Sequence, residues 1–261
     1  MDRTQLTELL AAVRAGTVSP DEAARRIGDL PYAEVVHAVG TTVIDHHREL
    51  RTGVPEIVYG ASKTAEQIAA ALRELAGGTG RAAIATRVDA AKAARVRELV
   101  PDAVHHELAS LVRLAGTGTP VRPPAATVAI VCAGTSDLPV AEEAALVAEF
   151  LGAPVVRVSD VGVAGLHRLL ARLDDIRRAE VVVAVAGMEA ALPSVLGGLV
   201  DRPLIAVPTS VGYGVSVDGL VALGALLAGC APGISVVNID NGVGAAVAAV
   251  RIARLAHRSA P

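Results

Sequence analysis

The sequence predicts an α/β protein whose C-terminal part is a three-layer parallel sheet. From about residue 127, short apolar segments alternate with helical patterns across short connections, which is typical of parallel βαβ units. The chain is 52% hydrophobic but only 2% aromatic, so small aliphatic side chains fill its core, as suits strands buried on both faces. We expect strands at about 127–132, 154–158, 180–185, 203–207 and 234–238, and helices at about 138–151, 163–173, 190–200, 215–228 and 243–256.

The N-terminal part is more charged and less regular, and it predicts a smaller α+β domain. A Gly- and Pro-rich stretch near residues 116–124 indicates the linker, so we expect domains at 1–118 and 119–261. The expected helices are 2–14, 20–28, 62–75 and 89–99, and the expected strand segments are 43–45, 56–59 and 82–86. Ser62 is the expected N-cap of the third helix, and Gly77 with Gly78 is expected to end it.

Overall charge and cysteine content exclude several classes of protein. The formal net charge is −3, and stacking aromatic residues are scarce, so nucleic acid is not an expected partner. Two cysteines form neither a disulfide framework nor a zinc pattern. The apolar runs are broken by Gly, Pro or charge, and the first residues are polar, so we expect neither a membrane span nor a signal peptide and place the chain in the cytoplasm.

Cys230 is the first candidate nucleophile. It lies in a turn rich in Gly and Pro between an expected helix and an expected strand, where a ligand can reach the sulfur. A free thiol has a pKa of about 8.5, so nucleophilic attack needs a helix terminus or a cation to stabilise the thiolate. The alternative is an ordinary turn cysteine. Cys132, at a strand end, is expected to be a small core residue.

Glu189 is the candidate acid or base. It follows the third expected strand of the C-terminal domain among small and apolar residues. Burial there would raise its pKa and suit it to proton transfer near neutral pH. The alternative is a glutamate that simply favours a helix N-terminus through the helix dipole.

The loops that follow the strands supply the other candidate contacts, because ligands of parallel sheets bind beyond the carboxyl ends of the strands. Residues 134–137 combine small residues and hydroxyls at a helix start, which suits an anion; the alternative is an ordinary N-cap formed by Ser136 or Asp137. Asp160 is a cap or a partner of a ligand hydroxyl. The candidate substrate-binding residues here are Gly134, Thr135, Ser136, Asp137, Asp160, Gly187, Met188, Tyr213, Gly214, Asp240 and Asn241.

Basic residues of the N-terminal domain form a second candidate group. Arg48, Arg51, Lys63 and Arg87 are candidate contacts to a polyanion, and the alternative is a solvated charged face. Asp45 followed by two histidines hints at a metal, but adjacent residues of a strand face opposite sides, so the motif is weak. The sequence assigns no metal ligands.

Three segments of the C-terminal domain resemble the PurE fold of aminoimidazole ribonucleotide carboxylases and mutases, a flavodoxin-like fold. They are Gly-Thr-Ser-Asp-Leu-Pro-Val at 134–140, Ala-Ala-Leu-Pro at 190–193 and Pro-Leu-Ile-Ala-Val-Pro at 203–208. After the second strand those enzymes carry Ala-His-Arg with a catalytic histidine, whereas this chain has Ser-Asp-Val-Gly-Val-Ala-Gly at 159–165. That difference counts against purine biosynthesis.

The pattern over nearly the whole chain is similar instead to the LarB family, the pyridinium-3,5-biscarboxylic acid mononucleotide synthases of nickel-pincer nucleotide biosynthesis. Beyond the PurE-like segments, the likeness rests on 45–53 with Pro55-Glu56 and Lys63-Thr64, on 160–170, on Gly187-Met188-Glu189, on 212–214, and on 230–233 with Asn241-Gly242. This resemblance implies carboxylation of nicotinic acid adenine dinucleotide at pyridinium C5, followed by hydrolysis that releases AMP.

The resemblance also implies roles for individual residues. Cys230 would form a transient adduct with the ring, and Glu189, expected on an adjoining loop, would remove the proton. CO2 or bicarbonate is the implied co-substrate, with Mg2+ on the substrate phosphates and no tightly bound organic cofactor. The implied assembly is a homo-oligomer, an octamer. The alternatives are a PurE-like aminoimidazole ribonucleotide carboxylase or mutase and a dinucleotide-binding protein without catalytic activity.

Overall fold

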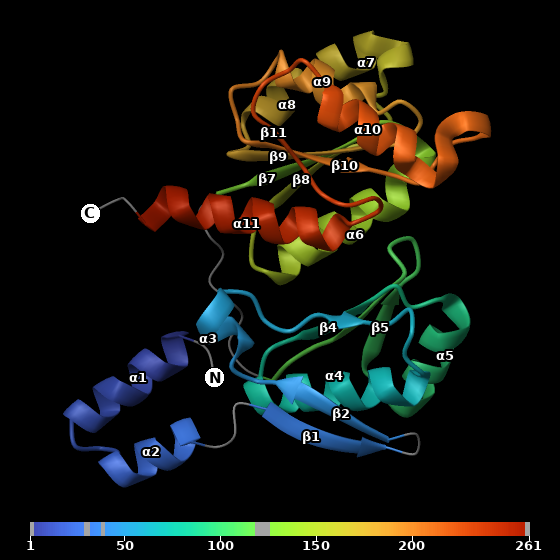
Figure 1. Ribbon diagram of the computed structural model, residues 1–261. Coiled ribbons are helices and arrows are strands. Elements are labelled where there is room, and N and C mark those ends of the chain that lie inside the picture. Colours follow the sequence, from blue (N-terminus) through green and yellow to red (C-terminus); the bar gives the residue numbers. More distant parts are fainter. Residues whose placement is uncertain (1–2, 29–31, 38–39, 118–125, 259–261) are drawn as a thin grey trace. The chain divides into compact units, whose positions relative to one another are not determined.

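The computed structural model describes residues 3–28, 32–37, 40–117 and 126–258. The chain divides into an N-terminal unit, Met1–Pro120, and a C-terminal unit, Val121–Pro261 (Figure 1). Within the described ranges, no helix combines the length and the apolar character that crossing a membrane requires.

The C-terminal unit is built on a five-stranded parallel sheet in the order β11-β10-β9-β7-β8. Its strands are β7 (Val128–Cys132), β8 (Val155–Val158), β9 (Val181–Ala186), β10 (Leu204–Pro208) and β11 (Ile234–Val236). Every residue of β7, β9 and β10 is buried, because helices cover both faces of these central strands. The predicted parallel α/β architecture is confirmed.

Helices form the outer layers of this unit (Figure 1). On one face α6 (Leu138–Phe150) packs against α11 (Gly242–Arg258), and on the other α9 (Ala191–Gly197) packs against α10 (Leu220–Ala228). Two predicted helices prove to be interrupted. The expected helix at 163–173 consists of η2 (Val163–Gly165), α7 (Leu166–Ala171) and the start of α8 (Leu173–Arg177), and the expected helix at 215–228 begins as η3 (Gly214–Gly219).

The N-terminal unit is α+β, as predicted. A mixed sheet runs in the order β3-β4-β6-β5, and β1 pairs with β2 in a separate antiparallel hairpin. The strands are β1 (Tyr32–His37), β2 (Gly40–Asp45), β3 (Val58–Tyr59), β4 (Ala83–Thr86), β5 (Ala103–His106) and β6 (Leu111–Leu114). The helices are α1 (Arg3–Arg14), α2 (Pro20–Gly28), α3 (Arg48–Thr52), α4 (Ala65–Thr79) and α5 (Ala90–Leu99). The sequence reasoning missed β1, β5 and β6.

Helix α4 corrects the prediction at both ends. Thr64, not Ser62, is its N-cap, and it forms a capping box with Gln67. The helix also runs through Gly78 and ends at Thr79. A Cβ atom on Gly78 would lie 2.6 Å from Cε1 of His46, so this glycine makes room for an imidazole ring instead of ending the helix. Gly80, with φ of 67°, provides the left-handed C-cap.

Candidate active site

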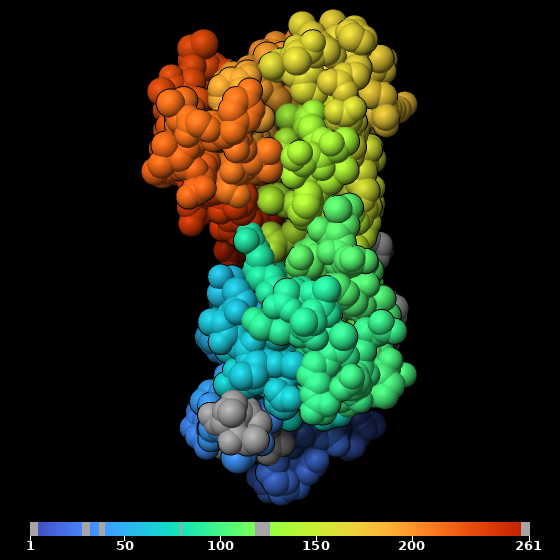
Figure 2. Space-filling model, turned by 90° about the vertical axis from the view of Figure 1, so that its right-hand side faces the viewer, coloured from blue at the N-terminus to red at the C-terminus, as the bar shows by residue number. Residues whose placement is uncertain are grey.

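The loops that follow the five parallel strands lie side by side at the carboxyl edge of the sheet. Backbone hydrogen bonds join each loop to its neighbour. They run from Val161 N–H to Cys132 O (3.1 Å), from Ala133 N–H to Val185 O (3.0 Å), from Met188 N–H to Val211 O (2.8 Å) and from Asp240 N–H to Pro208 O (2.8 Å). Figure 2 faces this edge, where the orange segment around residues 210–220 is exposed. The structure therefore gathers the candidate loops of the C-terminal unit on one edge.

Backbone strain concentrates at the same edge. Asp160, Met188 and Asp240 have φ values of 57°, 53° and 56°, in the left-handed region that non-glycine residues seldom adopt. Ala190, Val217 and Asp218 also have positive φ, and all six residues belong to segments that follow a strand. Such strain persists where surrounding contacts hold it, and it clusters at functional sites. The carboxyl edge is accordingly the candidate site of this unit.

Asp137 lies at the centre of this edge as a buried carboxylate, only 4% exposed. Its Oδ1 accepts a hydrogen bond from the Thr209 hydroxyl (2.6 Å) and its Oδ2 accepts one from the Gly134 N–H (3.0 Å). The Gly187 backbone N–H also favours the charged form of this carboxylate. Burial raises the pKa of Asp137, and these hydrogen bonds partly offset the effect. Both oxygens have protein donors, and the side chain is buried within the single chain.

Glu189 lies on the turn between β9 and α9 and is exposed, as is Met188. Glu189 is therefore not buried in the single chain, whereas its predicted role in proton transfer depends on burial. Thr135, Ser136, Tyr213 and Gly214 are exposed on neighbouring loops. These exposed groups are free to meet a ligand or a second protein surface.

The remaining predicted contacts at this edge have partners within the chain. Asp240 accepts a hydrogen bond from the Ser210 N–H (2.8 Å), and Asn241 Oδ1 accepts one from the Gly244 N–H (2.8 Å) at the start of α11. Asp160 forms an ion pair with Arg168 Nη1 of α7 (2.5 Å). The sequence reasoning missed Arg168 and Thr209. Arg168 was visible within the LarB-like segment 160–170, whereas nothing in the sequence linked Thr209 to Asp137.

Cys230 corrects a central expectation. Its thiol is exposed, as predicted, in the turn between α10 and β11. A residue that precedes a strand of a parallel sheet lies at the amino edge, whereas Glu189 follows β9 and lies at the carboxyl edge. The two residues are therefore at opposite edges of the sheet, not on adjoining loops. The turn instead packs near the second half of α9, where a Cβ on Gly229 would lie 3.2 Å from Ser194 Oγ.

Cys132 occupies the core, in agreement with its predicted role. It is fully buried at the end of β7, and its thiol donates to the Gly134 carbonyl (2.9 Å). Burial, reinforced by the negative charge of Asp137, raises the pKa of Cys132 to about 12. Cys132 is therefore a thiol, not a thiolate, near neutral pH.

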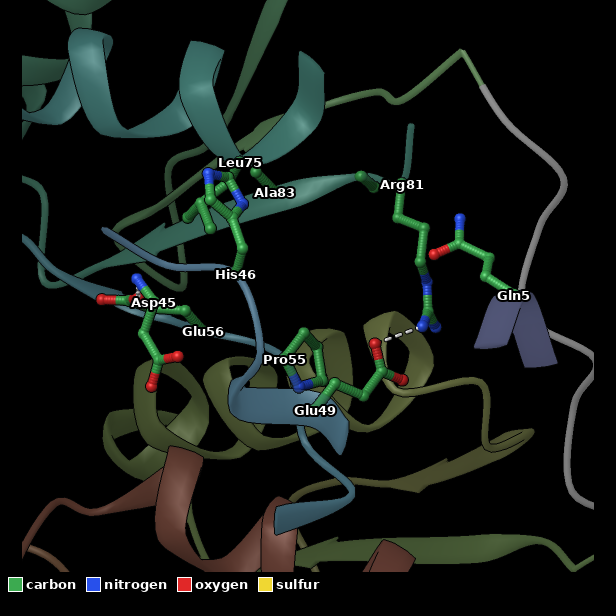
Figure 3. A pocket seen from close by; sticks show the side chains of 10 residues that line it. Gln5, Asp45, His46, Glu49, Pro55, Glu56, Leu75, Arg81 and Ala83 are labelled. Atoms are coloured by element: carbon green, nitrogen blue, oxygen red, sulfur yellow. Dashed lines mark hydrogen bonds and ion pairs between the residues drawn. The ribbon is translucent and has the colours of Figure 1, made fainter. Parts of the chain in front are cut away.

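The charged motif of the N-terminal unit surrounds a small pocket (Figure 3). Asp45 pairs with Arg51 (2.5 Å), and this hydrogen bond lowers the pKa of Asp45 against the opposing effect of burial. His46 Nε2 lies 2.9 Å from Glu74 Oε1, and Glu49 forms a part-buried ion pair with Arg81. A cavity of about 20 Å3 has room for about one water molecule.

This pocket does not form a metal centre. Across the described ranges, no group of three or more His, Cys, Asp or Glu side chains is arranged to hold a metal ion. Carboxylates of the motif have partners within the unit. Asp45 pairs with Arg51, and Glu56 accepts a hydrogen bond from the Asp45 N–H (2.7 Å).

The four basic candidates of the N-terminal unit are not gathered at one place, and Arg51 is paired with Asp45. Lys63 and Arg87 follow β3 and β4, whose carboxyl ends meet because the Gly60 N–H donates to the Thr86 carbonyl (2.8 Å). Arg48 lies on α3 beside Glu49, whose partner Arg81 precedes β4. Lys63 and Arg87 thus lie near the carboxyl end of β4, whereas Arg48 lies on the helix that is tied to the opposite end of this strand.

Two protein-family models match the chain. Residues 127–260 match the AIR carboxylase family, and residues 36–116 match the LarB/PurE-like N-terminal domain. The chain therefore belongs to the AIR carboxylase family, in which aminoimidazole ribonucleotide carboxylases have the PurE-like flavodoxin fold. Within it, the additional N-terminal domain gives the LarB-like architecture that the sequence resemblance predicted.

Curated relatives agree with this assignment. An uncharacterized protein of Methanocaldococcus jannaschii is 38% identical over 97% of this chain and 98% of its own length. The N5-carboxyaminoimidazole ribonucleotide mutases of M. jannaschii and Pyrococcus horikoshii are 35% and 32% identical over 49% and 48% of this chain, covering 79% and 71% of their own lengths. Together with the family models, the two mutases support an enzyme of the carboxylase family.

Proposed function

We propose that this protein carboxylates the pyridinium ring of nicotinic acid adenine dinucleotide at C5 and then hydrolyses the phosphoanhydride, releasing AMP and pyridinium-3,5-biscarboxylic acid mononucleotide. The observation that carries the proposal is the exposed Cys230 thiol, placed in a turn of small residues in a chain of LarB-like architecture. A thiol in this setting is accessible to a flat ring.

The chemistry explains why a thiol and a carboxylate are needed. A pyridinium ring is electron-poor and does not attack CO2. Addition of the Cys230 thiolate converts the ring to an enamine, whose carbon attacks CO2. Glu189 then takes the proton from that carbon, and departure of the thiolate restores the aromatic ring. The net change replaces a ring hydrogen by a carboxylate and needs no oxidant or reductant.

The opposite positions of Cys230 and Glu189 require that the reacting pair come from two copies of the chain. In this arrangement, Cys230 of one copy meets the Glu189 edge of another, and the contact also shields Glu189 from water. Exposed apolar residues along η3 and α10 support assembly, since Tyr213 and Val215 are each 82% exposed. Others in the same segment are Val217, Leu220 and Leu227. The family resemblance implies an octamer.

The substrate phosphates are assigned to two groups of residues. The exposed Thr135 and Ser136 offer hydroxyls at the carboxyl edge of the C-terminal unit. Arg48, Lys63 and Arg87 are the proposed basic contacts of the N-terminal unit. Mg2+ enters the proposal only as a counter-ion of the phosphates, because the described side chains form no preassembled cation site.

A direct assay tests the reaction. The purified protein is incubated with nicotinic acid adenine dinucleotide, bicarbonate and Mg2+, and AMP and the biscarboxylated mononucleotide are measured by mass spectrometry. Equal yields of both products are expected. Absence of both products with an intact, folded protein would refute the assigned substrate, and AMP alone would refute the carboxylation.

Mixing inactive variants tests the two-copy site. Cys230→Ala and Glu189→Gln are each expected to be inactive, and oligomers reassembled from equal amounts of both should recover on the order of a quarter of wild-type activity, because a quarter of random neighbour pairs hold both intact residues. Reassembled wild-type protein is the control for recovery. If mixed oligomers form but remain inactive, the two-copy site is wrong.

The second candidate function is that of an N5-carboxyaminoimidazole ribonucleotide mutase, which the two mutases among the relatives favour. Against it, residues 159–165 lack the Ala-His-Arg motif that the resemblance to those enzymes leads us to expect. Turnover of that ribonucleotide by the wild-type protein, retained in Cys230→Ala, would favour this function.

A further inference from the structure

The turn that carries Lys63 is held by a lysine from a different helix. Residues 60–64 connect β3 to α4, and the Lys92 ammonium donates to the Gly60 carbonyl (3.2 Å) and to the Ala61 carbonyl (2.7 Å). The Gly60 carbonyl also accepts a hydrogen bond from the Lys63 N–H (3.2 Å), which closes the turn. One ammonium group therefore bonds to the backbone of the two residues with which this turn begins.

Lys92 lies at a helix position that disfavours a cation. It belongs to the first turn of α5 (Ala90–Leu99), and the N-terminal end of a helix carries a partial positive charge. Asp89, the N-cap, accepts a hydrogen bond from the Lys92 N–H (2.8 Å), and its carboxylate lies 3.8 Å from the Lys92 ammonium. This carboxylate offsets the unfavourable charge, and the carbonyls of residues 60 and 61 are further partners of the ammonium. The placement indicates that Lys92 serves the neighbouring turn, not the formation of its own helix.

The same turn fits closely against the backbone around Arg87. The Gly60 N–H donates to the Thr86 carbonyl (2.8 Å), and a Cβ on Gly60 would lie 2.7 Å from Val88 Cγ2. Arg87, between these two residues, has φ of 57°, and the Val88 N–H donates to the Ser110 carbonyl (2.8 Å). A left-handed conformation at a residue with a Cβ atom persists only when surrounding contacts impose it. A displaced turn would therefore disturb the backbone of Arg87 as well.

We propose that Lys92 is a positioning residue for Lys63 and Arg87, because it holds the turn at residues 60–63 in the arrangement in which these two side chains receive the substrate phosphates. This inference rests on the proposed function, which assigns phosphate contacts to Lys63 and Arg87. Contacts that are ordered before binding spare the ligand the cost of ordering a mobile turn. Lys92 thus contributes to affinity for the dinucleotide, not to the chemical step.

Lys92→Met and Lys92→Arg test the role as a matched pair. Methionine keeps an unbranched apolar side chain and removes every donor, whereas arginine retains donors for the two carbonyls. Lys92→Met is expected to raise KM for nicotinic acid adenine dinucleotide about 10-fold with kcat nearly unchanged, and Lys92→Arg is expected to stay within about threefold of wild type. A fall in kcat with unchanged KM in Lys92→Met would overturn the inference.

A double variant shows whether Lys92 acts through Lys63. Because the two residues serve the same contact, Lys63→Met combined with Lys92→Met should raise KM by less than the product of the two single effects. A rise equal to that product would overturn the inference, since it would assign Lys92 a contact of its own with the substrate.

Hydrogen–deuterium exchange of the full chain without substrate separates failure of this inference from failure of the proposed function. Peptides covering 58–66 should exchange faster in Lys92→Met than in wild type, Lys92→Arg or Lys63→Met. Peptides covering 40–45, in the hairpin of the same unit, are the internal reference and should not change. Faster exchange at 58–66 would support the positioning role even if the wild type did not turn over the dinucleotide. Unchanged exchange there in folded Lys92→Met would overturn it.

Discussion

Charged side chains have different kinds of partner in the two units. In the N-terminal unit, opposite charges pair with one another around a small cavity, as in the Glu49–Arg81 ion pair. At the carboxyl edge of the C-terminal sheet, the buried Asp137 has a hydroxyl and backbone N–H groups as partners, and strained backbone surrounds it. Opposite charges of the N-terminal motif are therefore paired with one another, whereas the buried charge at the carboxyl edge has uncharged partners.

This difference teaches that a motif dense in charge need not be an open ligand site, because its charges can have partners within the unit. Residues 45–51 look like a ligand site in sequence because they combine carboxylates, histidines and arginines. In the structure, partners within the unit occupy several of these groups, including Asp45 and His46. The exposed Glu189 and Cys230 stand in segments of small residues, which attract less notice.

The two cysteines provide the largest expected contrast. Cys230→Ser should lower turnover by about 1,000-fold or more, because serine is a far weaker nucleophile at neutral pH, while unfolding is unchanged at this exposed site. Cys132→Ala should retain turnover but lose about 1–2 kcal/mol of unfolding free energy, because it leaves a small cavity in the core. Steady-state kinetics and urea unfolding measure both. Full turnover in Cys230→Ser would remove the thiol from the mechanism.

The two glycines of α4 test the packing within the N-terminal unit. Gly77→Ala meets no atom within 4 Å and should stabilise the unit by about 0.5–1 kcal/mol, since alanine favours a helix. Gly78→Ala places its Cβ against the His46 ring, which Glu74 holds, and should be less stable than Gly77→Ala by about 1 kcal/mol or more. Thermal melts compare the pair. Equal melting temperatures would show that the ring moves aside without cost.

Opposite pH dependences give the smallest expected contrast. The pKa of Asp45 is lowered below 3.8 in the folded chain, so its contribution to stability is present above pH 3.8 and is lost as pH falls through the folded pKa. The pKa of Asp137 is raised, so its contribution is present below pH 3.8 and is lost as pH rises through the folded pKa.

Urea unfolding between about pH 3 and pH 7 measures this contrast. Asp45→Asn should remove part of the stability loss at acid pH, and Asp137→Asn should remove part of the loss on raising the pH. The Asp45 effect is expected to be small because its partner Arg51 is largely exposed. Changes of the same sign in both variants would contradict the assigned directions.

The order of strands and helices in the C-terminal unit was predictable because apolar segments and short connections repeat regularly along the sequence. The three missed strands of the N-terminal unit had no such regularity. β5 contains two histidines, and β6 has an arginine among its apolar residues. Gly78 was misread because its function depends on the ring of His46, which is 32 residues away along the chain and invisible to a local helix rule.

The site was less predictable than the fold. Exposure of Cys230 followed from its turn, but its position before β11 already determined the amino edge, and the expectation of adjoining loops overlooked that rule. The hydrogen bond of Asp137 to Thr209 could not be derived locally, because Thr209 lies 72 residues further along the chain.

The unequal exposure of the two sulfur atoms has a consequence for oxidative damage. Peroxides and thiol-modifying reagents act on accessible thiolates, and the buried Cys132, with its pKa of about 12, is protected from them. In this chain, oxidative stress would therefore be registered at Sγ of Cys230, where one added oxygen atom would mark a damaged molecule.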